Sequence, residues 1–156
     1  MKHLKKLAAL LLVGVLALSL LTACGGGGGS TSADAQAEAA VMAAINQNPN
    51  RSGKDKLQNS SELRKIANQD LDVAIRLGKL SSSFTIVPHI EDGKFGGTFI
   101  AKCDYKNTDL AKLIKTDTNI NSYHMDKWSE VGVVVRTVDG QTYIAISVAI
   151  KTAIKT

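Results

Sequence analysis

The side chains with the most versatile chemistry in this 156-residue chain are two cysteines, Cys24 and Cys103, and the two later histidines, His89 and His124. A thiolate is a nucleophile and a metal ligand, and an imidazole is an acid–base group and a zinc ligand. A catalytic zinc site normally uses three protein ligands, so two histidines supply only part of one. What these four side chains can do depends on the elements that hold them.

Cys24 ends a segment with the features of a lipoprotein signal peptide. Residues 1–6 are basic, and residues 7–21 form an uncharged apolar run, shorter than the ~20 residues that span a bilayer. The run closes with Leu-Thr-Ala-Cys24, which resembles a bacterial lipobox, where the thiol is lipidated and becomes residue one. We therefore predict a signal peptide at 1–23 and extracytoplasmic attachment to the bacterial cell membrane through lipidated Cys24. An ordinary signal peptide and an uncleaved anchor are the alternatives.

Removal of this leader changes the charge and the cysteine chemistry. The formal net charge falls from +5 to +2 when Lys2, Lys5 and Lys6 are lost, and no basic block with interleaved aromatic residues remains. We therefore expect no nucleic-acid partner. Once Cys24 is lipidated, Cys103 has no partner for an intramolecular disulfide. Its position in an apolar run favours a buried small hydrophobic side chain over a reactive thiol.

Residues 24–33 comprise the lipidated cysteine and a tether rich in glycine and serine, and residues 34–156 form one domain. Alanine-rich residues 34–46 predict a helix. Apolar residues at helical spacing predict a second helix from about residue 59, with Asn59 as its cap, Glu62 as its capping-box partner and Gly78 at its end. Arg64 and Asp70 belong to its outer face.

The remaining elements are short strands, one short helix and a hairpin. Residues 83–88 predict a strand, and residues 98–103 predict a strand or a strand-to-helix junction. Residues 89–93 predict a loop, and residues 109–115 a helix capped by Asn107 or Thr108. Residues 116–121 are polar and predict a loop. Asp139-Gly140 favours a type I′ turn that sets Val135 opposite Ile144 and Val131 opposite Val148. This order predicts an α+β fold with helices on a mainly antiparallel sheet that ends in the C-terminal hairpin.

Several segments, in this order, resemble the CAP superfamily of secreted proteins in a compact bacterial form. The segments are Val41–Asn46 and Leu63–Leu77 for its first two helices, Phe84–Gly93 for its first cleft histidine, Gly97–Ala101 for a degraded Gly-Glu-Asn-Ile-Ala motif, Asn121–His124 for its Ser-x-x-His segment, and Ser129–Val134 for its Glu-Val-Gly-Val-Gly strand. The resemblance implies a three-layer α/β/α sandwich and a cleft with two histidines and glutamate, which holds a divalent metal in some members.

Carried onto this sequence, the resemblance places His89 and His124 at the two histidine positions and Thr98 at the glutamate position. Threonine cannot replace a carboxylate as an ionised ligand or general base near neutral pH. We therefore expect a degenerate cleft that binds a surface ligand (lipid, peptide or protein) without catalysis. A zinc-assisted hydrolase using both histidines is one alternative, and an unrelated α+β lipoprotein with a structural role is another.

Overall fold

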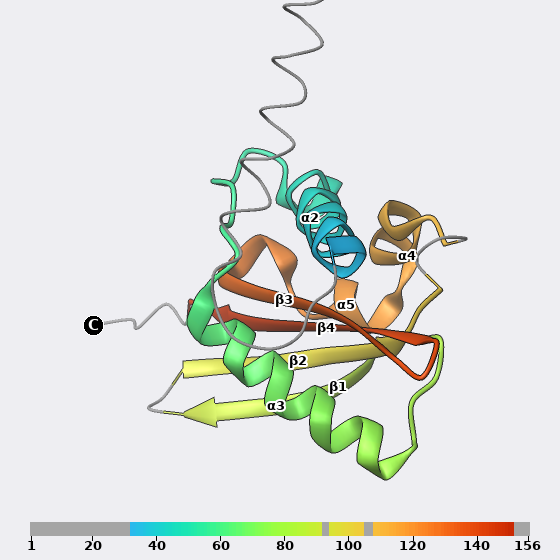
Figure 1. Cartoon of the computed structure of the whole chain (residues 1–156). Coiled ribbons are helices and arrows are strands. Elements are labelled where there is room, and N and C mark those ends of the chain that lie inside the picture. The colour runs from blue at the N-terminus through green and yellow to red at the C-terminus, as the bar shows by residue number, and fades with distance from the viewer. Residues whose placement is uncertain (1–31, 92–93, 105–107, 152–156) are drawn as a thin grey trace, which may run out of the picture.

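The computed structural model of the chain describes residues 32–91, 94–104 and 108–151 (Figure 1). Its centre is a four-stranded antiparallel sheet with the strand order β1-β2-β4-β3. The strands are β1 Thr85–Glu91, β2 Lys94–Lys102, β3 Trp128–Val138 and β4 Gln141–Ile150. β1 and β3 are therefore the two edges of the sheet.

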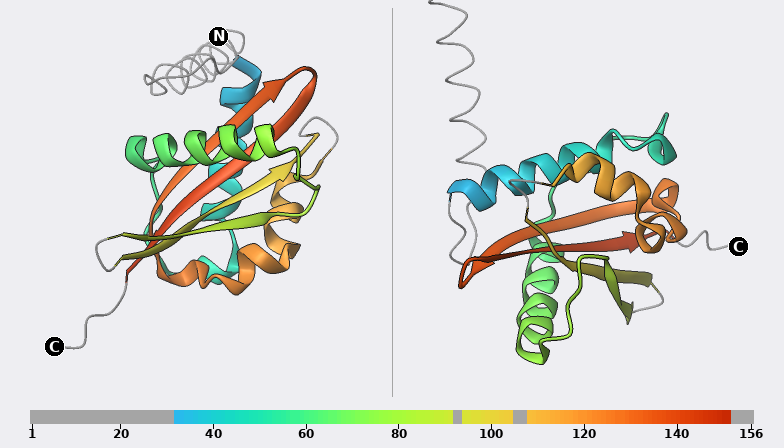
Figure 2. Two further views of the ribbon diagram at one scale, coloured as in Figure 1. Left: turned by 90° about the horizontal axis from the view of Figure 1, so that it is seen from below. Right: turned by 90° about the vertical axis from the view of Figure 1, so that its right-hand side faces the viewer.

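Helices cover both faces of this sheet (Figures 1 and 2). The helical segments are α2 Ser32–Asn46, η1 Pro49–Arg51, α3 Ser61–Leu77, α4 Leu110–Thr116, α5 Thr118–Ser122 and η2 Met125–Lys127. α2, α4 and α5 pack on one face around the larger apolar core, and α3 packs alone on the other face over a smaller core. The predicted α+β fold, a three-layer sandwich that ends in a hairpin, is confirmed. No helix among the described residues is long and apolar enough to cross a membrane.

The C-terminal hairpin has the predicted register. Asp139 and Gly140 have φ angles of 49° and 78°, the left-handed values that a type I′ turn needs. Val131, Val133 and Val135 lie opposite Val148, Ile146 and Ile144, and all six side chains are buried in the larger core. Burial of each such side chain stabilises the fold by about 1.5–3 kcal/mol. This hairpin is the platform on which both helical layers rest.

Gly132 lets α3 approach the opposite face of the hairpin. A Cβ atom at this position would overlap the backbone of Leu63 and Arg64 in the first turns of α3. Only glycine leaves the backbone this close to another element without a clash. The smaller core then forms farther along α3, where Ala67 and Leu71 are fully buried.

Two predicted helix caps and one predicted loop are wrong, each because a neighbouring residue makes a cap. Ser60, not Asn59, caps α3, with its Oγ accepting from Leu63 N at 3.5 Å. Asp109 caps α4, instead of Thr108 or Asn107, of which Asn107 lies outside the described residues. Asp117 ends α4 and caps α5, so residues 118–122 form a short helix where a loop was predicted. Gly78 ends α3 with a φ of 63°, as predicted.

The β1–β2 pair is longer than predicted. β1 runs on through residue 91 and β2 begins at residue 94, so residues 89–91 are strand and not loop. The residues between the two strands, 92–93, lie outside the described part of the chain. The consequence for the site is that His89 lies on a strand, where the alternation of side chains directs it to the face that α3 covers.

Candidate functional site

His89, Thr98 and Asp70 form a polar cluster between the sheet and α3. His89 Nε2 lies 2.7 Å from Asp70 Oδ2 and 3.2 Å from Thr98 Oγ1. Thr98 is fully buried, whereas the side chains of His89 and Asp70 are 35% and 17% exposed. β1, β2 and α3 therefore each contribute one polar side chain to a partly accessible site.

The geometry of this cluster fits a structural contact and not a catalytic triad. In a nucleophilic triad one imidazole nitrogen bonds the acid and the other bonds the hydroxyl. Here the same nitrogen, Nε2, contacts both the Asp70 carboxylate and the Thr98 hydroxyl. Nε2 carries one hydrogen or one lone pair, so it cannot relay a proton between these two partners. The contacts instead fasten the exposed end of β1 to α3.

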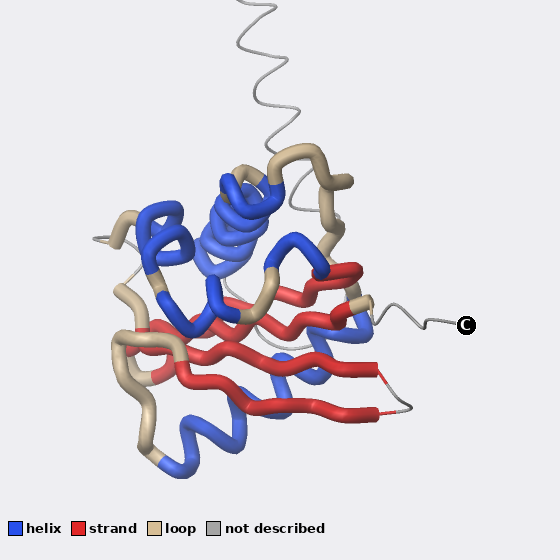
Figure 3. Tube along the Cα trace, turned by 180° about the vertical axis from the view of Figure 1, so that it is seen from behind, coloured by secondary structure: helices blue, strands red, loops and turns tan. Residues whose placement is uncertain are grey.

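His124 does not join this cluster. It follows α5 with a left-handed φ of 49°, and its carbonyl accepts from Lys127 N at 2.8 Å. Its neighbour Tyr123 packs against Phe95 and Phe99 in the core covered by α2. Figure 3 shows α5 in front of the sheet and α3 behind it. The expectation of one cleft shared by His89 and His124 is corrected, because the sheet separates the two segments.

Metal binding by these histidines stays a prediction. Across the described ranges, no three or more His, Cys, Asp and Glu side chains gather in a way that could hold a metal ion. Asp70 and His89 could supply two ligands, and Thr98 a weak third oxygen. Binding of zinc there would compete with the short bond between His89 and Asp70.

An apolar groove of about 210 Å³ adjoins the cluster. It runs between the C-terminal half of α3 and the start of β1, with Asp70 at one end and Lys79 at the other. Its apolar lining is Val73, Ala74, Leu77, Leu80, Val87 and Ile100. Val73 and Leu77 are 49% and 65% exposed, so the groove is open to solvent along α3.

Sequence reasoning placed Asp70 on the outer face of the helix, and this was wrong. Asp70 follows the buried Ala67 by three residues and precedes Ala74, another groove residue, by four. That spacing puts Asp70 on the margin of the apolar stripe of α3, and from this its inward position could have been predicted. Arg64 also reaches inward, because its Nη1 lies 2.9 Å from Glu38 Oε2.

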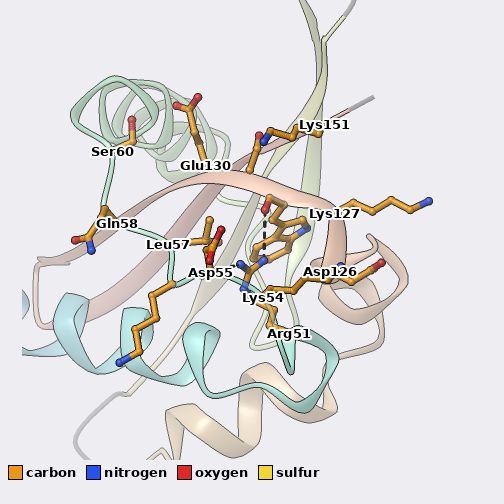
Figure 4. Close-up of a pocket in the computed structure, with 13 residues that line it drawn as sticks. Arg51, Lys54, Asp55, Leu57, Gln58, Ser60, Asp126, Lys127, Glu130 and Lys151 are labelled. Atoms are coloured by element: carbon orange, nitrogen blue, oxygen red, sulfur yellow. Dashed lines mark hydrogen bonds between the residues drawn. The ribbon is translucent and has the colours of Figure 1, made fainter. Parts of the chain in front are cut away.

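A second and larger cavity, of about 600 Å³, lies at the end of the molecule where β3 begins (Figure 4). Its charged lining residues come from the 51–60 segment, η2, β3 and the end of β4, and they are Arg51, Lys54, Lys56, Lys127 and Lys151 with Asp55, Asp126 and Glu130. Five of these side chains are cationic and three are anionic, so the lining carries both signs of charge.

Arg51 braces this second cavity. Its Nη1 donates to Met125 O at 2.7 Å, and its Nη2 donates to Asp55 O at 2.8 Å. Burial lowers the pKa of the Arg51 guanidinium, while the carboxylates of Asp126 and Asp55 act in the opposite direction. The guanidinium stays charged at neutral pH and ties η1 to η2, which is a role in the fold.

Cys103 is a core residue, as predicted, and Trp128 is another. Cys103 is a free, buried cysteine, and burial raises the pKa of its thiol, so the reactive thiolate is suppressed. Trp128 is 4% exposed, and its Nε1 donates to Tyr123 O at 3.0 Å. Cys24 lies outside the described residues, and its lipidation stays a prediction.

No family model matches the sequence, no curated protein matches it, and no solved structure matches the fold. The resemblance to the CAP superfamily therefore stays a prediction. The geometry of the site is the basis for a functional proposal.

Proposed function

We propose that the chain is a lipid-anchored extracytoplasmic protein whose domain binds a partner at the bacterial cell surface without catalysis. One observation carries the binding part. The large apolar side chains that stay exposed in the described ranges are Val73, Leu77, Ile90 and Phe95. All four lie on β1 or next to it, two on each face of the sheet. Exposed apolar patches on a small domain are typical of interaction sites.

The arrangement of the domain supports a partner away from the membrane. Ser32, the first described residue, lies eight positions after Cys24, and the glycine-rich tether predicted from the sequence would reach about 15 Å. α2 begins beside the β3–β4 turn, and the free end of the β1–β2 pair lies at the opposite end of the molecule (Figure 2). Anchoring through Cys24 would therefore leave β1 accessible.

The His89 cluster supports binding more than catalysis. The contacts of the His89 ring with Asp70 and Thr98 converge on one ring nitrogen. The position that the CAP resemblance aligns with a glutamate is the buried Thr98. A metal-assisted hydrolase that uses His89 and His124 together would need both rings at one ion. The His89 side chain faces α3, whereas His124 follows α5, which packs on the opposite face of the sheet.

Anchoring is tested by thiol counting and cell fractionation. Lipidated Cys24 would have no free thiol, and Cys103 is buried, so the intact protein should react with a thiol reagent only after unfolding, at one site per chain. The Cys24→Ser variant should leave the membrane fraction. Two reactive thiols after unfolding, in protein isolated from membranes, would contradict lipidation.

Binding is tested with a photo-crosslinking side chain placed at Leu77 in intact cells. The same group at Glu62, an exposed position in the first turn of α3, is the matched control. We expect a discrete adduct at Leu77 alone. Absence of any adduct at Leu77, or turnover of peptide or ester substrates that His89→Ala abolishes, would overturn the proposed function.

A further inference from the structure

β1 presents unpaired backbone groups along its outer edge. Ser81 precedes β1 in the chain, and its carbonyl accepts from Lys102 N at 2.8 Å. Lys102 therefore directs its backbone groups toward β1, and so do the other even-numbered residues of β2. By the register, Ile100, Thr98 and Gly96 pair with Thr85, Val87 and His89. In an antiparallel ladder the alternate residues direct their N–H and C=O groups away from the partner. Those residues of β1 are Ile86, Pro88 and Ile90.

The start of this edge is closed and the rest is open. Phe84 N donates to Asp117 Oδ2 at 3.3 Å, and Phe84 O accepts from Asn119 Nδ2 at 2.6 Å. Beyond Phe84, none of the residues that the structure describes bonds the outward N–H of Ile86 or Ile90. The open stretch therefore has two donors and three acceptors, because Pro88 has a carbonyl but no N–H.

Apolar side chains border this edge on both faces of the sheet. Val73 and Leu77 of α3 lie on one side, above Val87 in the groove. Ile90, which is 79% exposed, and Phe95, its partner in the register, lie on the other side. A strand added next to β1 would place alternate side chains against these two patches.

We propose that β1 is a docking edge for an extended segment of another polypeptide, which adds to the sheet as a fifth strand beside β1. This inference rests on the proposed binding function and names the class of partner. Main-chain hydrogen bonds to Ile86, Pro88 and Ile90 hold the segment, and apolar side chains at alternate positions fill the α3 groove.

Charge at the two ends of the groove predicts the charge pattern of the segment. Asp70 lies at the end near His89, and Lys79 lies at the end near Thr85. A segment antiparallel to β1, like every other pair in this sheet, enters beside Asp70 and leaves beside Lys79. It is therefore basic near its amino end and acidic near its carboxyl end.

Pro88 favours a different polypeptide over a second copy of this chain. Two copies paired antiparallel about Pro88 would face one proline with the other, and that pair would lose both of its hydrogen bonds. A segment without proline opposite Pro88 loses only one. The same proline limits uncontrolled edge-to-edge association of the free protein.

The test uses hydrogen exchange on the full chain held in a lipid nanodisc. The probe is a short synthetic peptide with valine at alternate positions, lysine near its amino end and glutamate near its carboxyl end. We expect the peptide to protect the amides of Ile86 and Ile90 from exchange. A peptide with the two charges exchanged should bind more weakly, and a peptide with methylated backbone nitrogens should not bind.

Two variants of Ile90 separate the backbone from the side chain. Ile90→Pro removes an N–H that β2 does not use, so the fold should persist while peptide affinity falls about tenfold. Ile90→Val keeps the N–H and should bind almost as well as the native chain. The methylated peptide leaves the protein unchanged and removes the donors to the carbonyl groups of Ile86, Pro88 and Ile90. It therefore tests main-chain bonding along the same edge even if Ile90→Pro does not fold.

Three results would overturn the inference. Perturbation of Val73 and Leu77 without amide protection would identify the groove as a site for a small apolar ligand or lipid. Protection of Ile86 and Ile90 without peptide, rising with protein concentration, would identify a second copy as the occupant. Absence of protection at millimolar peptide would exclude strand addition. If the Leu77 crosslink persists in that case, the binding function stands and only the strand inference fails.

Discussion

The two edges of the sheet carry similar backbone groups and treat them in opposite ways. On β3 the outward groups bond partners from earlier in the chain. Val131 O accepts from Ser60 N at 2.8 Å, and Val133 N donates to Asn59 Oδ1 at 2.8 Å. Val135 N donates to Glu38 Oε1 at 3.2 Å, and Thr137 N donates to Asp34 Oδ2 at 3.3 Å. On β1 the outward groups of Ile86 and Ile90 face solvent. Each of these four residues of β3 has at least one bonded outward group, whereas β1 is blunted only at Pro88.

The closed edge also joins the two helical layers. Glu38 comes from α2 on one face, and Arg64 comes from α3 on the other, and their side chains meet at 2.9 Å beside β3. Glu38 is 1% exposed, so its carboxylate depends on this ion pair and on Val135 N. The buried carboxylates along this edge therefore stabilise the fold and leave no room for a ligand strand. The contrast indicates that the open edge is available for binding.

The largest effect is expected from opening the closed edge with Glu38→Ala. The substitution leaves Arg64 and Val135 N without the carboxylate, and loss of one member of a buried pair costs about 3–5 kcal/mol. Urea unfolding measures the free energy of unfolding. The control is Asp72→Ala, which removes the partner of Arg136 in a pair whose acid is 54% exposed and should cost less than about 1 kcal/mol. Equal losses in both variants would contradict the comparison.

A smaller effect is expected at Asn59, which bonds both backbone groups of Val133. Its Oδ1 accepts from Val133 N at 2.8 Å, and its Nδ2 donates to Val133 O at 3.3 Å. Asn59→Ala should cost about 1–3 kcal/mol, because both groups lose their partner beside a buried strand. Asn59→Asp keeps the acceptor and should cost less than Asn59→Ala. The reverse order in urea unfolding would show that the side chain is not closing the edge.

The sequence predicts those parts of this fold whose signals are local. The hairpin register follows from Asp139-Gly140 and the alternation of the flanking valines, and the structure has that register. The closure of β3 has no local signal, because Glu38 and Val135 are 97 positions apart. A buried carboxylate on a helix looks in the sequence like a solvated one.

The candidate site was predictable in part for the same reason. His89 and Thr98 lie on adjacent strands and meet as the resemblance implied, but the resemblance did not show which face of the sheet each segment covers. His124 was therefore paired with His89, although its segment packs over the opposite core. Asp70 was missed because its partner is on a strand that was predicted to end before His89.

A modest effect is expected from restoring the missing donor of the open edge with Pro88→Val. The free energy of unfolding should change by less than about 0.5 kcal/mol, because β2 does not bond this position. Self-association should strengthen by about tenfold for each hydrogen bond gained between copies, as measured by sedimentation velocity. Thr85→Val is the matched control, since its N–H already belongs to the β2 ladder. Unchanged association in Pro88→Val would mean that Pro88 does not blunt the edge.

The effect expected at the two histidines is smaller than a tenfold gain in association, and it separates their roles. His89→Ala removes the bond to Asp70 that fastens β1 to α3, and a partly exposed pair of this kind contributes about 0.5–1 kcal/mol to the free energy of unfolding. The same variant should let the end of β1 open more often, which faster amide exchange at Val87 and residue 89 would report. His124→Asn keeps a residue type that tolerates the left-handed φ at this position and should change neither quantity. Faster exchange in β1 after His124→Asn would mean that the two histidines act on one site. An effect of His89→Ala alone would show that His89, and not His124, fastens β1 to α3 at the margin of the open edge.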